Sequence, residues 1–89
     1  MTAIILTEID KENWGFVLYK GGNGKWYVDF PYSPVSFVDL FMLIELSELE
    51  KAKAEQNRQF LCVLSDLIKN DFNSYLSRAL NRNNFIFND

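Results

Sequence analysis

All glycines and prolines of the chain lie within its first 34 residues, and neither residue type occurs after Pro34. Glycine and proline are the residues that most strongly interrupt helices and central strands. The first third of the chain can therefore turn tightly and often, whereas the remainder can continue as helices. This asymmetry predicts an α+β fold in which a sheet is followed by helices.

The first third alternates between apolar and polar residues as strands do, with turn residues between the segments. The segment Gly21-Gly22-Asn23-Gly24 supplies residues that accept positive φ, as a tight hairpin turn requires. Residues 1–32 are therefore predicted to form a three-stranded antiparallel β-meander. Its strands are expected over residues 4–9, 14–20 and 25–30.

The helical part is predicted to cover residues 33–82, because Pro31 and Pro34 do not fit a central strand. Expected breaks near residues 46–47 and 70–71 divide it into two or three α-helices. An apolar stripe with a spacing of three and four runs from Phe60 to Leu80 and would pack these helices on one face of the sheet.

Two segments match the capping box that starts a helix. Ser47 is followed three residues later by Glu50, and Ser36 is followed by Asp39 in a weaker version. Residues 83–89 are expected to form a tail that adds a short strand or frays.

The composition fits one domain of 89 residues and excludes several chemistries. Hydrophobic residues make up 48% of the chain, which is enough to build a core. The chain has no histidine, so it lacks the imidazole of Ser-His-Asp and Cys-His nucleophile systems. Its single cysteine, Cys62, lies among apolar residues and is expected to be an inert core thiol. We therefore predict no catalytic residue, metal or cofactor, and a protein that is not an enzyme.

The apolar run over residues 37–46 is interrupted by Asp39 and Glu45, and is much shorter than the roughly 20 residues that cross a bilayer. The first residues show no basic leader followed by a long apolar stretch, as a secretory signal would. With one free thiol, the cytoplasm is the expected location, and no membrane contact is expected.

The net charge of −3 is unevenly distributed along the chain. Residues 36–50 carry four acids and no base, whereas residues 51–89 carry four acids and six bases. Asp39, Glu45, Glu48 and Glu50 are therefore candidates for an anionic surface that attracts a basic partner. The alternative is an ordinary solvated helix face, because acids near helix N-termini are favoured by the helix dipole.

Aromatic residues are concentrated in the predicted sheet, and Trp14 is expected to share a strand face with Phe16 and Leu18. Core packing accounts for many of them, and Trp26 or Tyr32 could anchor a protein partner. Stacking of single-stranded RNA is a third interpretation, but the acidity of the chain argues against nucleic acid. The residues concerned are Trp14, Tyr19, Trp26, Tyr27, Phe30 and Tyr32.

The character of the chain is set by the strand segment Lys25-Trp26-Tyr27-Val28-Asp29-Phe30-Pro31-Tyr32 and by the acidic segment from Asp39 to Glu50. In architecture and charge it resembles the small acidic immunity proteins of bacterial polymorphic and contact-dependent toxin systems. This resemblance implies an α+β protein that binds and neutralises a basic nuclease toxin.

The lead hypothesis is an inhibitor of a cognate toxin domain, a ribonuclease or another nuclease. Glu45, Glu48 and Glu50 would occlude its cationic cleft, with Trp26 or Tyr32 as the apolar anchor. One alternative is a homo-oligomeric structural or adaptor domain, which uses the apolar stripe between copies. The other is a single-stranded RNA-binding module. A homodimer is also compatible with the lead hypothesis.

Overall fold

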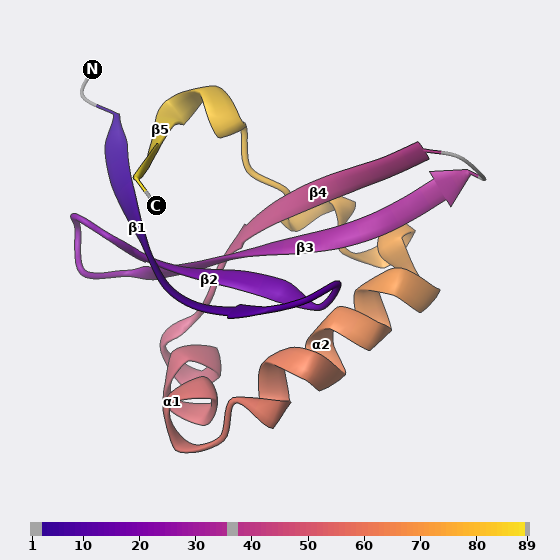
Figure 1. Ribbon diagram of the computed structural model, residues 1–89, viewed down its shortest axis with the longest axis horizontal. Coiled ribbons are helices and arrows are strands. Elements are labelled where there is room, and N and C mark those ends of the chain that lie inside the picture. Colours follow the sequence, from indigo (N-terminus) through magenta and orange to yellow (C-terminus); the bar gives the residue numbers. More distant parts are fainter. Residues whose placement is uncertain (1–2, 36–37, 89) are drawn as a thin grey trace.

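The computed structural model describes residues 3–35 and 38–88, without the side chains of residues 34, 35, 38 and 39. Five strands form one sheet in the order β4-β3-β2-β1-β5 (Figure 1). Two α-helices complete an α+β fold, the class that the sequence predicts. The elements are β1 (Ile4–Glu12), β2 (Phe16–Gly21), β3 (Trp26–Val35), β4 (Val38–Glu45), α1 (Glu48–Gln56), α2 (Gln59–Asn70) and β5 (Phe85–Asn88).

The predicted meander is present as β1, β2 and β3, which pair antiparallel in sequence order. The glycine-rich segment closes the β2–β3 hairpin as expected: Gly24 has a φ of 85°, and the amide of Gly21 donates to the carbonyl of Lys25 at 2.8 Å. The sheet is nevertheless larger than the predicted three strands, because β4 and β5 extend it at its two edges.

The prediction of helix from residue 33 onward is wrong at its start. β3 continues to Val35, and β4 lies where a helix was expected. Along β4, Met42 and Ile44 are buried in the core on the helix side, whereas Leu43 is buried in a second cluster. A strand with apolar residues on both faces lacks the alternation that identifies strands, so its sequence resembles that of a buried helix.

Proline is tolerated in β3 because the neighbouring strand has ended. Pro31 pairs with Phe41 of β4, whereas the pairing of β2 with β3 ends at Val17 and Asp29. The missing N–H of Pro31 therefore removes no bond to β2. Of the weaker capping box, Ser36 lies outside the described residues, and the backbone at residue 39 belongs to β4.

The stronger capping box is confirmed at the start of α1. The Ser47 hydroxyl accepts from the amide of Glu50 at 3.2 Å, and the Glu50 carboxylate accepts from the amide of Ser47 at 2.9 Å. The two expected breaks coincide with element boundaries, because α1 begins just after residue 47 and α2 ends at Asn70. The first of them, however, separates a strand from a helix, and the break between α1 and α2 at residues 57–58 was not predicted. No helix in residues 3–35 and 38–88 is long and apolar enough to cross a membrane.

Beyond α2 the chain forms three 3₁₀ turns, η1 (Phe72–Ser74), η2 (Leu76–Arg78) and η3 (Arg82–Asn84), in place of a further α-helix. β5 then pairs parallel with β1, so the tail adds a short strand. The C-terminal segment consequently returns to the N-terminal strand, and both ends of the chain lie on the same side of the molecule (Figure 1).

The two faces of the sheet are covered differently. α1 and α2 cover one face, where the apolar stripe of α2 packs Leu61, Leu64 and Ile68 into the main core. On the opposite face, Tyr19 and Tyr27 are buried beneath the C-terminal segment, with Phe87 and Phe85 edge-on to their rings. The aromatic surplus is therefore largely core. The part of this second face nearest the β1–β2 turn stays partly exposed, and its residues are Val17, Pro31 and Phe41.

Candidate partner-binding surface

The predicted acidic residues do not form one open surface. Glu50 is used inside the molecule: Arg78 donates to its two carboxylate oxygens at 2.6 and 3.0 Å, and the Glu50 side chain is only 19% exposed. The hydrogen bond from Arg78 lowers the pKa of Glu50 below its ordinary value. Glu45 pairs with Lys25 at 3.5 Å, and its carbonyl accepts from Arg78 at 3.1 Å.

Of the other predicted site residues, Glu48 is exposed on α1, and the side chain of Asp39 lies outside the described residues. Trp26 and Tyr32 are half-buried on the helix side of β3 and pack against the main core. They are six residues apart, which is about 20 Å along a strand. The structure therefore does not bring Trp26 and Tyr32 together in one site with the described acids.

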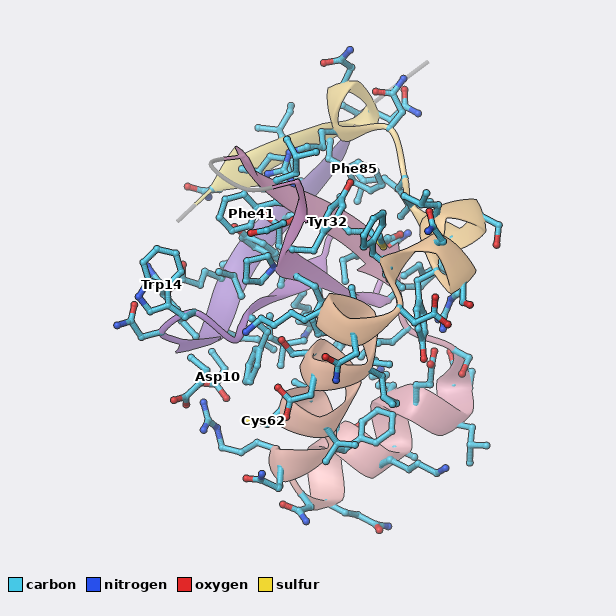
Figure 2. The ribbon with its side chains drawn as sticks, turned by 90° about the vertical axis from the view of Figure 1, so that its right-hand side faces the viewer. Asp10, Trp14, Tyr32, Phe41, Cys62 and Phe85 are labelled. Atoms are coloured by element: carbon cyan, nitrogen blue, oxygen red, sulfur yellow. The ribbon has the colours of Figure 1, made fainter. Side chains whose placement is uncertain are left out.

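All three arginines of the chain hold acids of distant elements, and local spacing in the sequence gave no sign of this. Arg58 donates to Asp10 at 2.9 and 3.1 Å and to Glu12 at 2.9 Å. These bonds lower the pKa of Asp10 and raise that of Arg58. Arg58 directly precedes α2, so these bonds connect the start of this helix to β1, and Figure 2 shows Asp10 beside the helices.

Arg82 makes the most buried of these pairs. Its guanidinium lies 2.6 Å from the carboxylate of Asp29, whose side chain is 6% exposed, and 4.5 Å from the ring centroid of Phe87. Arg82 therefore fastens the C-terminal segment to the second face of the sheet.

The sequence prediction also placed Trp14 wrongly. It is not on a strand face with Phe16 but in the turn between β1 and β2, where the amide of Gly15 donates to the carbonyl of Glu12 at 2.9 Å. Trp14 has a φ of 60°, a left-handed conformation that normally favours glycine or asparagine. Its side chain is nevertheless 69% exposed. The polar residues before it and the glycine after it were the available turn signal.

Two side chains of α2 hold the β1–β2 turn in place. The Lys69 ammonium donates to the carbonyl of Trp14, and the hydroxyl of the buried Ser65 donates to the carbonyl of Gly15 at 2.6 Å. The strained backbone is therefore fixed by two side chains of one helix, and the indole is presented to solvent in a defined place. Figure 2 shows Trp14 projecting from the edge of the molecule.

Two hollows meet at Trp14 and Pro31. One, of about 200 Å³, is lined by Val17 and Phe41 on the second face of the sheet. The other, of about 240 Å³, is lined by Tyr32, Ser33 and Lys69. Phe41 is 52% exposed. We call the residues Trp14, Val17, Pro31, Tyr32 and Phe41 the Trp14 surface.

The described residues hold no cluster of metal-ligating side chains. No group of three or more Cys, Asp or Glu side chains among them is placed to hold a metal ion. Cys62 is half-buried on α2 beside the main core. The Trp14 surface combines exposed apolar side chains with two adjoining hollows.

No protein-family model matches the chain. The comparison with curated proteins gives no match either, and neither does the comparison with solved structures.

Proposed function

We propose that the protein is a non-catalytic binding protein of the immunity type, which neutralises a partner toxin domain by docking it on the Trp14 surface. One observation carries this proposal: a strained left-handed residue is a tryptophan, and two side chains of α2 fix it in a position where it is 69% exposed. Backbone strain concentrates at functional positions, and tryptophan is the typical anchor of a protein interface.

The partner that best fits the charge of the whole chain is basic, such as a nuclease domain in the cytoplasm. Several acids form no ion pair with any described residue and are distributed over β1, α1 and α2, so they would speed the encounter rather than make one contact. These acids are Glu8, Glu48, Glu55 and Asp66. Direct occlusion of a cationic cleft by Glu50 is disfavoured, because Arg78 already occupies its carboxylate.

The test compares three baits in quantitative affinity capture from the native cell lysate: the wild-type protein, Trp14→Asn and Leu49→Asn. Leu49 is the matched control, since it is 66% exposed and lies on α1 away from the Trp14 surface. We expect one basic protein to be retained by the wild type and by Leu49→Asn. Its retention by Trp14→Asn should be weaker by about 30-fold, the effect of losing an interface anchor of about 2 kcal/mol.

The purified partner then decides the function. We expect it to degrade RNA or DNA, and one equivalent of the wild-type protein should suppress this activity. Retention that is equal for Trp14→Asn would remove the Trp14 surface from the proposal. A partner whose activity is unaffected by the bound protein would contradict the immunity role.

A further inference from the structure

Two lysines, Lys11 and Lys69, flank the Trp14 surface. Lys11 lines the hollow that contains Phe41, and Lys69 lines the hollow that contains Tyr32. Both are exposed. The Lys69 ammonium donates to the carbonyl of Trp14, which leaves its charge uncompensated, and the Lys11 ammonium forms no ion pair with any residue that the structure describes.

Negative charge near these lysines is partly neutralised. Glu12 is the one carboxylate among the described residues that lines either hollow, and the guanidinium of Arg58 lies 2.9 Å from it. The same guanidinium holds Asp10. Lys11, Lys69 and Arg58 carry three positive charges against the two negative charges of Asp10 and Glu12. Among the described residues, this group of side chains beside the Trp14 surface therefore has a net charge of +1, in a chain with a net charge of −3.

We propose that the Trp14 surface takes an acidic segment of the partner protein, whose apolar side chains enter the two hollows while its carboxylates face Lys11 and Lys69. This inference rests on the docking proposed above and adds the chemistry of the docked segment. Each hollow is smaller than the roughly 300–1,000 Å³ of small-molecule sites, which favours single side chains as occupants. On a basic toxin, such a segment lies outside the cationic cleft.

A single-stranded nucleic acid would also bring negative charge, together with bases that stack on tryptophan. Its binding needs a positive groove that follows a run of phosphates. Two lysines beside one indole match a pair of carboxylates and not a phosphate backbone, so the charges favour the peptide.

The test selects peptides from a random phage-displayed library on the wild-type protein at low ionic strength. Two enriched peptides are synthesised and titrated by calorimetry into the wild type, Lys11→Glu, Trp14→Asn and Lys53→Glu. Lys53 is the matched control, because it is exposed on α1 above the ring of Phe60 and its reversal changes the net charge equally. An oligouridylate is titrated in parallel.

We expect the enriched peptides to combine Asp or Glu with apolar residues. Lys11→Glu should weaken their binding about five- to tenfold at low ionic strength and much less in high salt. Trp14→Asn should abolish binding, and Lys53→Glu should leave it nearly unchanged. Neutral or basic enriched peptides, equal binding to Lys11→Glu, or tighter binding of the oligouridylate would each overturn the inference.

The two proposals fail in different ways. If a partner is captured through Trp14 but binds Lys11→Glu as tightly as the wild type, the acidic segment is wrong and the docking stands. If acidic peptides bind through Trp14 but no inhibited partner is captured, the immunity role is wrong and the surface chemistry stands.

Discussion

Replacement of Trp14 by asparagine should leave the free energy of unfolding nearly unchanged, although it removes one of the two tryptophan side chains of the protein. The reason is that two effects of opposite sign meet at this residue. The side chain is 69% exposed, so little contact is lost, and the backbone has a φ of 60°, which asparagine tolerates better than tryptophan.

The magnitudes follow from the covered third of the side chain. A buried aromatic residue covers about 150–250 Å². The covered third of Trp14 then corresponds to roughly 50–80 Å², or about 1–2 kcal/mol at about 25 cal/mol per Å². Relief of the left-handed strain returns about 1–2 kcal/mol. The expected change is therefore within about 1 kcal/mol of zero.

Alanine at the same position is the matched control, because Trp14→Ala loses the same contact and keeps the strain. Urea unfolding followed by far-ultraviolet circular dichroism should show Trp14→Ala to be less stable than Trp14→Asn by about 1 kcal/mol. Equal stability of the two variants would refute the strain, and with it the argument that the turn presents the indole. A loss above about 3 kcal/mol in Trp14→Asn would show that Trp14 is a core residue.

Two further predictions concern the ion pairs. The hydrogen bond from Arg78 lowers the pKa of Glu50 in the folded state. The pair therefore stabilises the fold at pH values above the unfolded pKa, near 4.5, and this stabilisation is lost as the pH falls through the folded-state pKa of Glu50. An acid titration of stability should therefore show a smaller loss below about pH 4.5 in Glu50→Gln than in the wild type; identical curves would contradict this. Arg82→Ala leaves the buried carboxylate of Asp29 without its partner and should lower the free energy of unfolding, measured in urea, by roughly 2–3 kcal/mol. Adding Asp29→Asn to the same chain should restore part of this loss. A further loss in the double variant would argue against the pair.

The parts of the fold that the sequence predicted are those governed by neighbouring residues. The Ser47–Glu50 capping box and the glycine turn after β2 each depend on a few consecutive side chains, and both are present. β4 was missed because its sequence has apolar residues on both faces, and only its pairing with β3 separates a strand from a helix there. β5 depends on β1, which is about eighty residues earlier in the chain.

The candidate site was less predictable than the fold, for the same reason. Trp14 alternates with Phe16 and Leu18 and so resembles a strand residue. Its exposure follows from Lys69 and Ser65, which reach its turn from a helix more than fifty residues later. The ion pairs of Glu50 and Glu45 were not predicted, because their partners are also distant or on another strand.

The arginines explain why the uneven charge of the chain does not become an acidic face. The acids before residue 51 and the excess of bases after it are complementary parts of one molecule, and folding brings them together. Arg58, Arg78 and Arg82 each fix a segment after residue 51 to an acid before residue 51. Charge counted by segment therefore overstates what remains for a partner. Lys11 and Lys69 form no such ion pair with the described residues, and they flank the more exposed of the two tryptophans. The charges of these two lysines beside Trp14 therefore remain free to select a partner.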